Sequence, residues 1–357
     1  MNSTETGDIA VTKKNQAVEQ LDMSALEKYL GDALPQFRGP IKAEKFTGGQ
    51  SNPTFKLETG AGTFVLRRQP PGKLLKSAHA VDREFRVMRA LQDSAVPVPK
   101  VLHLCEDPQV IGSMFYLMEY CEGRIFWDAA LPELDNTQRK AFYEEMNRVL
   151  AALHSIDIDA AGLSDYGRPG NYFERQFQRW EGQYRASELN TIPAMDQLIA
   201  WLGGNLPADD GRVALVHGDY RLDNIVFHPT ESRAIAVLDW ELSTLGHPFA
   251  DLAYQCMQLR MPANSGNISG LMGVDRASLG IPSEREYVAR YCERMGIPGI
   301  DNWAFYLAFS FFRLAAIIQG VAKRAQDGNA SSSSAAKLGA FVDPLAKLAL
   351  DVIEKES

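Results

Sequence analysis

The pattern of apolar and polar positions predicts that the first third of the chain forms a small β-rich unit. Residues 1–20 are polar and aperiodic, which predicts a mobile tail. A short helix is expected at 24–34. A second helix is expected at 79–91, where the apolar side chains share one helical face. Short apolar segments separated by glycine-containing turns predict strands at 41–46, 54–58, 63–67, 101–105 and 113–119.

Beyond Glu122 the apolar spacing becomes mostly helical. Helices are expected at 136–155, 172–185, 194–202, 249–260, 284–295, 302–325 and 335–354. Three short apolar segments interrupt them as strands, at 214–216, 225–227 and 234–238. Ser283 and Glu286 form a capping-box pattern before one helix, and Pro344 is expected to kink or start the last one.

The order of these elements predicts an α+β protein with two lobes. The expected divisions are a tail at 1–20, a first lobe at 21–119, a hinge at 120–123 and a second lobe at 124–357. Ligands bind by default in the cleft of such a two-lobed protein, so we expect the functional site there.

The segment VHGDYRLDNIVF carries the strongest chemical signal. It presents His217, Asp219 and Asn224 between two apolar strands, and twenty residues after Asp219 another apolar strand ends at Asp239. Carboxylate and amide oxygens suit magnesium, which usually shares its ligands with substrate phosphates. Asp and Asn are also common in tight turns, and for Asp219 or Asp223 taken singly that interpretation would be the better one. The complete string favours phosphoryl-transfer chemistry.

Composition narrows the classes of protein. Lys and Arg total 37 against 45 Asp and Glu, a formal net charge of −8, which argues against a nucleic-acid partner. Four scattered cysteines without a C-x-x-C pair argue against a zinc or redox site. We found no signal-peptide segment and no apolar run approaching a membrane span, so we expect a cytoplasmic protein without a membrane partner.

From about 40 to 325 the chain resembles the aminoglycoside-phosphotransferase and choline-kinase superfamily, relatives of the protein kinases. The resemblance implies a protein-kinase-like bilobal fold and an enzyme that uses ATP and Mg²⁺. It makes Asp219 the catalytic base and Asn224 and Asp239 the metal ligands, while His217 braces the loop. Asp251, in HPFADLAY, matches a carboxylate that hydrogen-bonds the catalytic loop; it would also suit the first turn of a helix.

The first lobe offers matching parts for the nucleotide. Gly48, Gly49 and Ser51 stand where the family holds phosphates, although a Gly-Gly pair is usually only a hairpin turn. Arg67 occupies the position of the family's strand lysine; it keeps the charge but is bulkier. Glu84 would be its helix partner, and the alternative is an exposed helical glutamate in a weak pair.

Three further positions follow from the same resemblance. Arg221 stands where protein kinases carry a lysine near the γ-phosphate, and the alternative is a surface arginine. Glu241 follows Asp239 and would support the metal shell. Glu119, which directly precedes the hinge, would offer main-chain groups to adenine together with Cys121 within it.

The acceptor is the least determined part of the prediction. Three segments, PPGKLLKSAHAVDREFRVMRAL, HGDYRLDN and LDWELSTLGHPFADLAY, resemble kinase-like domains joined to, or encoded near, acyl-CoA dehydrogenases. That resemblance implies a small-molecule hydroxyl acceptor of the hydroxyacyl-CoA class. Alternatives are an aminoglycoside or other amino-alcohol kinase and a nucleotide-binding pseudokinase that regulates a partner. An anionic acceptor is indicated by three arginines of the second lobe, Arg175, Arg179 and Arg313. The oligomeric state stays open.

Overall fold

The computed structural model describes residues 21–46, 52–70, 79–263, 270–327 and 338–356. The expected tail at 1–20 and the glycine-containing loop with Gly48, Gly49 and Ser51 lie outside these ranges. The chain divides into two compact units. Unit 1 comprises 1–93, 98–122 and 238–241, and unit 2 comprises 94–97, 123–237 and 242–357. The segment with Asp239, which the expected boundaries place in the second lobe, therefore packs with the first.

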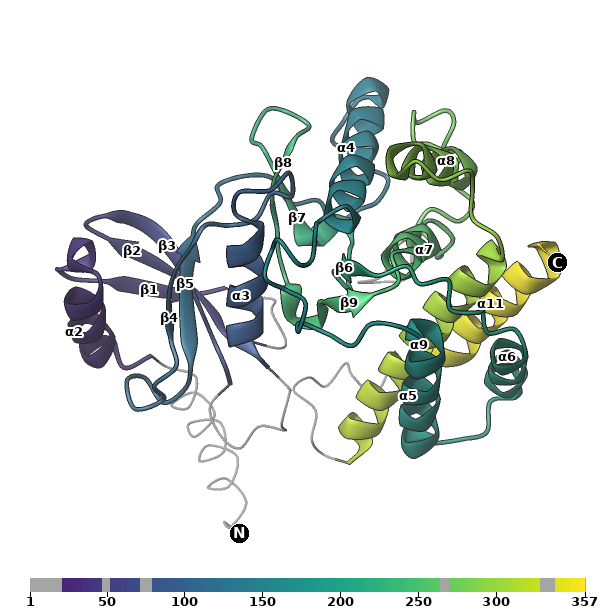
Figure 1. Ribbon diagram of the computed structural model, residues 1–357, viewed down its shortest axis with the longest axis horizontal. Coiled ribbons are helices and arrows are strands. Elements are labelled where there is room, and N and C mark those ends of the chain that lie inside the picture. The colour runs from purple at the N-terminus through teal and green to yellow at the C-terminus, as the bar shows by residue number, and fades with distance from the viewer. Residues whose placement is uncertain (1–20, 47–51, 71–78, 264–269, 328–337, 357) are drawn as a thin grey trace, which may run out of the picture. The chain divides into compact units, whose positions relative to one another are not determined.

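Unit 1 is built on a five-stranded sheet (Figure 1). Its strands are β1 (Lys42–Lys45), β2 (Thr54–Thr59), β3 (Gly62–Arg68), β4 (Val101–Cys105) and β5 (Phe115–Glu119). They run antiparallel in the order β1-β2-β3-β5-β4. In the central pair Arg67 lies opposite Tyr116, which brings two side chains of the later site onto one face.

Two helices cover the two faces of this sheet. Strand residues alternate between the faces, so Leu66 and Leu117 point to one side and Val65 and Tyr116 to the other. The first face packs with α2 (Met23–Ala33) and the short η1 (Pro35–Phe37) in one apolar cluster. The second is covered by α3 (Val81–Leu91), whose buried residues include Glu84 and Met88.

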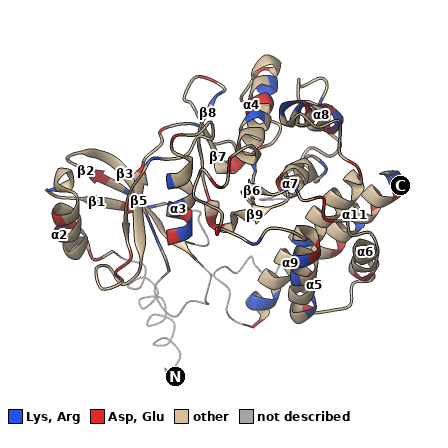
Figure 2. Cartoon of the chain, in the orientation of Figure 1, with Lys and Arg blue, Asp and Glu red and all other residues tan. Residues whose placement is uncertain are grey.

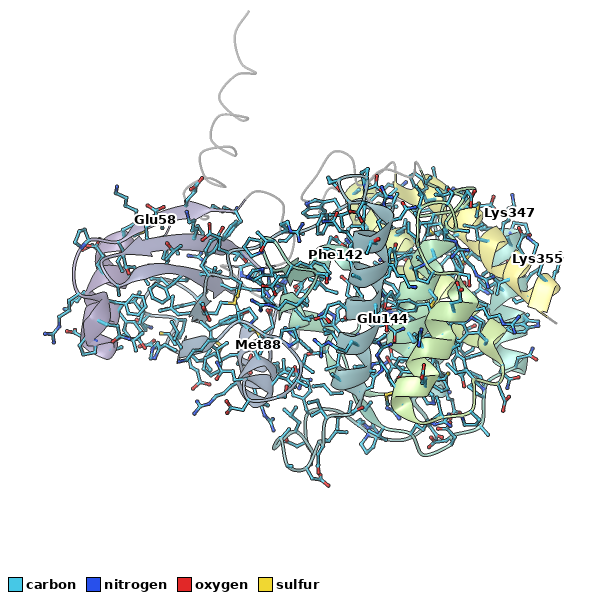
Figure 3. The ribbon with its side chains drawn as sticks, turned by 90° about the horizontal axis from the view of Figure 1, so that it is seen from above. Glu58, Met88, Phe142, Glu144, Lys347 and Lys355 are labelled. Carbon is cyan, nitrogen blue, oxygen red and sulfur yellow. The ribbon has the colours of Figure 1, made fainter. Side chains whose placement is uncertain are left out.

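Unit 2 consists of helices packed around α9. Its helices are α4 (Asn136–His154), α5 (Tyr172–Ser187), α6 (Pro193–Gly204), α7 (Phe249–Leu259), α8 (Glu284–Met295), α9 (Trp303–Gln326), η4 (Gly339–Phe341) and α11 (Val342–Glu356). The capping box of Ser283 and Glu286 before α8 is confirmed. Pro344 lies in the first turn of α11, where a missing N–H costs nothing, so it starts the helix. The exposed Lys347 and Lys355 mark its outer side (Figure 3).

The strands of unit 2 form two small antiparallel pairs that frame the loop of interest. They are β6 (Ala214–Val216) with β9 (Thr244–Gly246), and β7 (Ile225–Phe227) with β8 (Ala234–Val237). Two single-turn helices, η2 (Leu222–Asn224) and η3 (Trp240–Leu242), accompany them. Because β6 and β7 are both fully buried, the residues between them are held at both ends.

Helix α9 departs from the expectation that no apolar run approaches a membrane span. By length and composition it could cross a membrane, with a mean hydropathy of 1.6 over its most apolar window. However, 72% of that window is buried inside the structure, and the helix packs against α5, α7 and α11. We therefore interpret α9 as a core helix, whose apolar surface is covered by protein.

Candidate active site

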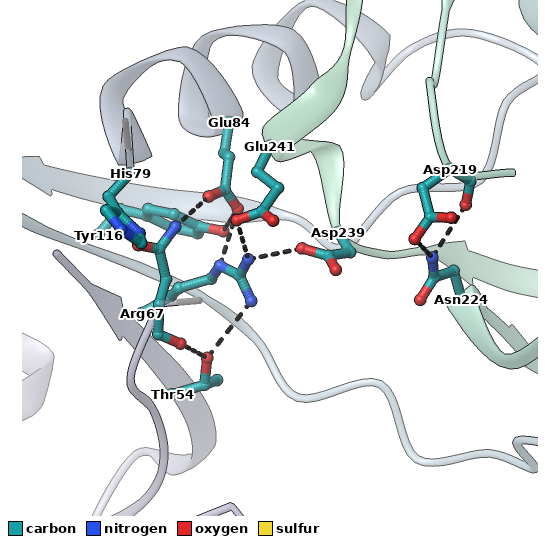
Figure 4. Close-up of polar contacts among 10 residues, drawn as sticks. Thr54, Arg67, His79, Glu84, Tyr116, Asp219, Asn224, Asp239 and Glu241 are labelled. Carbon is teal, nitrogen blue, oxygen red and sulfur yellow. Dashed lines mark hydrogen bonds and ion pairs between the residues drawn. The ribbon is translucent and has the colours of Figure 1, made fainter. Parts of the chain in front are cut away.

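The loop after β6 brings Asp219 and Asn224 together within unit 2 (Figure 4). Asn224 Nδ2 donates to the main-chain oxygen of Asp219 at 2.9 Å and to its Oδ2 at 3.1 Å. These bonds use the amide nitrogen, so the side-chain oxygen of Asn224 stays available as a ligand. The single turn of η2 creates this pairing because it folds Asn224 back toward a residue five positions earlier.

Asp251, at the start of α7, fixes the beginning of the loop. Its Oδ2 accepts the N–H of His217 at 2.6 Å and its Oδ1 accepts the N–H of Gly218 at 2.8 Å. Burial alone would raise the pKa of Asp251, but the hydrogen bond and charge of His154 and the charge of His217 hold it below its ordinary value. The carboxylate thus satisfies two buried main-chain donors, as the family resemblance implied for this residue.

His217 and Gly218 shape the turn that presents Asp219. His217 is completely buried, and its Nδ1 accepts the N–H of Asp219 at 3.2 Å, which agrees with a bracing role. Gly218 has φ +84°, and a Cβ there would lie 2.7 Å from the carbonyl oxygen of Leu242. Both the backbone conformation and the space therefore require glycine.

Two further residues lie near Asp219: Tyr254, which was not predicted as a site residue, and Arg313, which was predicted only as a hint of an anionic acceptor. Tyr254 on α7 hydrogen-bonds the side chain of Asp219, and burial followed by the nearby Asp219 raises the pKa of Tyr254. Arg313 on α9 donates from Nη2 to the Gly218 oxygen at 2.6 Å. Tyr254 lies one helical turn after Asp251, and this spacing was the only signal in the sequence that could have pointed to it.

Arg221 is paired within its own loop. Its Nε donates to Asp223 Oδ1 at 2.7 Å and its Nη2 contacts the second oxygen of the same carboxylate. The guanidinium fork is thus occupied by a residue two positions away, and its charge is partly offset. The expected role beside the γ-phosphate stays a prediction.

In unit 1 the expected pair of Arg67 and Glu84 forms, and Arg67 also reaches Asp239 (Figure 4). Arg67 Nε lies 2.8 Å from Glu84 Oε2, and its Nη2 lies 2.6 Å from Asp239 Oδ1 and 3.7 Å from Glu241 Oε2. Burial alone would lower the pKa of Arg67, but these carboxylates, led by Glu84, raise it above its ordinary value. One arginine on β3 therefore holds a carboxylate on α3 and two that follow β8.

Glu84 is not the exposed helical glutamate of the alternative interpretation, because only 1% of it is exposed. Its Oε1 accepts from Asn52 Nδ2 at 2.8 Å and its Oε2 accepts from Tyr116 OH at 3.1 Å. His79 Nδ1 lies 3.0 Å from the Asn52 oxygen and extends the network. Burial raises the pKa of Glu84, whereas Arg67 acts in the opposite direction. Asn52 and Tyr116 were not singled out from the sequence, since neither type signals a buried ion pair.

Asp239 has a backbone conformation that suits a functional position. Its φ is +65°, in the left-handed region that a residue with a side chain rarely adopts. Strained residues of this kind concentrate at ligand-binding sites. Its side chain is 35% exposed, and Arg67 occupies only Oδ1. The second oxygen has no partner among the described residues and is available to a ligand.

The donor chemistry fits magnesium when nucleotide phosphates complete the coordination. No group of three or more His, Cys, Asp and Glu that could hold a metal occurs among the described residues. Magnesium keeps waters and binds proteins through one or two carboxylates together with phosphates, so a complete protein cage is not required. The assignment of Asn224 and Asp239 as its ligands stays a prediction.

Glu119 and Cys121 lie where the two units are joined along the chain. Glu119 ends β5 and donates its N–H to the Lys100 oxygen at 2.8 Å. Cys121 comes directly before the boundary at Glu122, and burial followed by Glu119 raises the pKa of its thiol to about 11. Contact with adenine through main-chain groups stays a prediction for both residues.

Together, the sheet-based unit, the helical unit and the braced Asp219 loop define a kinase-type phosphotransferase. The family model described as the phosphotransferase enzyme family matches residues 42–302, and this chain belongs to that family. A Ralstonia eutropha JMP134 protein, provisionally named an aminoglycoside phosphotransferase, is 49% identical; it has a TM-score of 0.85 over 94% of this chain and 99% of its own.

A more distant structure supports the fold alone. Aminoglycoside phosphotransferase APH(4)-Ia, solved with ADP and hygromycin B, is 14% identical, with a TM-score of 0.60 over 92% of this chain and 98% of its own. The kinase-like fold predicted from the sequence is thereby confirmed.

The curated relatives carry another name. Acyl-CoA dehydrogenase family member 10 of Mus musculus is 50% identical over 96% of this chain and 32% of its own length. Acyl-CoA dehydrogenase family member 11 of Rattus norvegicus is 46% identical over 93% of this chain and 43% of its own length. The chain thus spans 32% to 43% of the length of these relatives. Their names confirm the predicted resemblance to kinase-like domains associated with such dehydrogenases.

Proposed function

We propose that this protein transfers the γ-phosphate of ATP, with Mg²⁺, to a hydroxyl group of a hydroxyacyl-CoA. The observation that carries the phosphotransfer proposal is the Asp219 loop. Its carboxylate is oriented by Asn224 and Tyr254, and its main chain is fixed by the buried Asp251. A base that must meet a hydroxyl in one geometry gains from such fixed positioning.

In the proposed mechanism Asp219 accepts the proton of the acceptor hydroxyl as that oxygen attacks the γ-phosphorus. The bond from phosphorus to the bridging oxygen breaks, and ADP carries away the electron pair. Bound Mg²⁺ would neutralise charge on the phosphates, and Asn224 and Asp239 would hold it. Arg67, kept in place by Glu84, would attract the nucleotide phosphates through its charge.

The relatives support the choice of acceptor. Their names place them among acyl-CoA dehydrogenases, while this chain spans only the kinase-like portion. A phosphotransferase next to a dehydrogenase of acyl-CoA would act on the same class of thioester. Aminoglycoside phosphorylation is the second candidate, favoured by the name of the 49% identical Ralstonia structure. A pseudokinase is the third, and the presence of Asp219, Asn224 and Asp239 argues against it.

An acceptor screen tests the proposal. ADP release would be measured with ATP and Mg²⁺ in the presence of hydroxyacyl-CoAs, aminoglycosides, choline and simple sugars, with Asp219→Asn as the inactive control. We expect turnover with a hydroxyacyl-CoA that is lost on chelation of Mg²⁺. Turnover with aminoglycosides alone would select the second candidate, and nucleotide binding without any turnover would select the third.

A further inference from the structure

Two helices of unit 2 bring basic side chains toward the catalytic loop. Helices α5 and α9 pack through aromatic pairs, with ring centroids 5.4 Å apart for Phe173 and Phe309 and 5.9 Å for Phe177 and Phe312. Figure 2 shows basic residues on both helices. These rings are the buried side of the contact, so the charged side chains lie at its margin.

Arg313 links the edge of the contact between α5 and α9 to the loop that carries Asp219. Its Nη2 donates to the Gly218 oxygen at 2.6 Å, directly before Asp219. Its guanidinium carbon lies 5.4 Å from the ring centroid of Tyr254 and 5.6 Å from that of Trp180. Since Tyr254 also hydrogen-bonds Asp219, a single side chain contacts both the base and this arginine.

Arg179 approaches the same tryptophan from α5. Its guanidinium carbon is 5.4 Å from the ring centroid of Trp180, so both arginines are placed over one ring. Arg175 lies one turn earlier, and its Nη2 donates to the Arg168 oxygen at 2.5 Å. Burial raises the pKa of Tyr172 to about 12, while Arg313, Arg179 and Arg175 all act to lower it. The three guanidinium charges therefore all act on Tyr172.

The acidic residues of α5 do not neutralise this group. At roughly 100° per residue, Arg175 and Arg179 fall on the same helical face as Tyr172, whereas Glu174 and Glu181 fall on the opposite one. Within the ranges that the structure describes, neither Arg179 nor Arg313 has an ion-pair partner. The nearby Asp251 is occupied by main-chain N–H groups. The positive charge is therefore available to a ligand.

We propose that Arg313, Arg179 and Arg175 form the acceptor subsite, which binds the phosphate groups of an anionic acceptor such as a hydroxyacyl-CoA. The inference rests on the proposed function, in which Asp219 is the base. Three uncompensated guanidinium groups attract phosphates through charge-assisted hydrogen bonds. They also repel polycations, so the same residues select against aminoglycosides.

Steady-state kinetics with two matched acceptors tests the subsite. One acceptor is a hydroxyacyl-CoA, and the other is its N-acetylcysteamine thioester, which has the same hydroxyl and thioester but no phosphates. Arg179→Gln and Arg313→Gln are each expected to lower kcat/KM for the CoA ester by roughly 10- to 100-fold, the loss of a hydrogen bond to a charged group. For Arg179→Gln, turnover of the short thioester and the KM for ATP should change little. Arg313→Gln also removes the bond to Gly218, so its effect is judged by the excess loss for the CoA ester over the short thioester.

Matched variants separate this role from a structural one. Arg290→Gln on α8 removes one exposed charge outside the group and should leave both acceptors unaffected. Arg313→Lys should recover part of the loss. An equal fall for both acceptors would mean that Arg313 only supports the loop, and a rise in the KM for ATP alone would assign these arginines to the nucleotide. Either result overturns the proposal.

Calorimetric titration with CoA itself distinguishes the failure of this inference from the failure of the proposed function. The unmodified protein should bind CoA with an affinity that falls with salt, and Arg179→Gln should weaken it roughly 10- to 100-fold. Such binding without phosphotransfer to any hydroxyl would reject the proposed function and retain the anion subsite. Phosphotransfer to a hydroxyacyl-CoA that neither arginine variant changes would retain the function and reject the subsite. Absence of CoA binding would also reject the subsite.

Discussion

Asp219 is oriented by two donors, so replacing it by asparagine changes its proton chemistry more than its place. Asp219→Asn removes the proton acceptor but keeps a side chain of the same size beside Asn224 and Tyr254. We expect kcat to fall on the order of 10²- to 10⁴-fold, the usual contribution of a positioned general base. ATP affinity, measured by calorimetry, should stay within a few fold. A variant with kcat near that of the unmodified enzyme would show that another residue is the base.

A second prediction for a single residue concerns how much Arg67 contributes to the free energy of unfolding. Arg67→Met leaves Glu84 buried at 1% exposure without its cation, which typically costs about 3–5 kcal/mol for a broken buried pair. Denaturant unfolding should show this loss, and Arg67→Lys should recover part of it. Lys56→Met breaks the exposed pair with Glu58 and serves as the control, because solvent screens an exposed ion pair and its loss should change stability little. Equal losses for Arg67→Met and Lys56→Met would contradict the assigned importance of the buried pair.

Individual site residues differ in how far the sequence could predict them. The pairing of Arg67 with Glu84 and the contact of Asp251 with the loop followed from the family resemblance, and both are present. The contact of Arg67 with Asp239 joins residues 172 positions apart, and only folding brings them together. Arg313 shows the same limit, since its spacing on α9 reveals an amphipathic position but not the carbonyl group it will meet.

At the scale of elements, most helices and strands lie where the apolar periodicity predicts them. The strand β9 was missed because its three residues, Thr244–Gly246, are too few to show alternation and end in glycine. The grouping of residues 238–241 with unit 1 was also missed. Such a grouping depends on contacts rather than on order along the chain, and this explains why a division by position placed Asp239 with the helices.

The link between α7 and the catalytic loop yields an element-scale prediction. Asp251→Asn supplies one acceptor oxygen in place of two, so the buried N–H of His217 or Gly218 loses its partner. We expect the free energy of unfolding to fall by about 3 kcal/mol and kcat to fall with it, because the loop that carries Asp219 is loosened. Denaturant unfolding and ADP release would be measured on the same preparation. An unchanged kcat together with lower stability would separate α7 from the catalytic geometry.

The same residue predicts a pH dependence. The pKa of Asp251 is held below its ordinary value in the folded protein, so its ionised form favours folding. Its contribution should be fully present above the unfolded value of about 3.9 and disappear as the pH falls through the lower folded value. The stability difference between the unmodified protein and Asp251→Asn should therefore be constant at neutral pH and shrink below about pH 4. A difference that grows on acidification would contradict this sign.

At the scale of the whole molecule, Asn224 and Asp239 are the residues proposed to hold magnesium. The described residues contain no complete cluster of His, Cys, Asp and Glu for a metal. A metal that relies on nucleotide phosphates for part of its coordination should bind strongly only with the nucleotide. Nucleotide binding should thus be measurable as a property of the full chain that depends on Mg²⁺.

Thermal stability with and without nucleotide tests this dependence. At a hundredfold excess over its Kd, Mg-ATP should stabilise the protein by about 2.7 kcal/mol, which raises the melting temperature. Chelation of Mg²⁺, or Asp239→Ala, should remove most of this increase because the phosphates lose the charge that neutralises them. Asp239→Ala also removes a partner of Arg67, so each variant is compared with its own nucleotide-free melt. Glu58→Ala removes a carboxylate from the exposed pair with Lys56 and should respond to Mg-ATP like the unmodified protein. Full stabilisation of Asp239→Ala by Mg-ATP would place the metal ligand elsewhere.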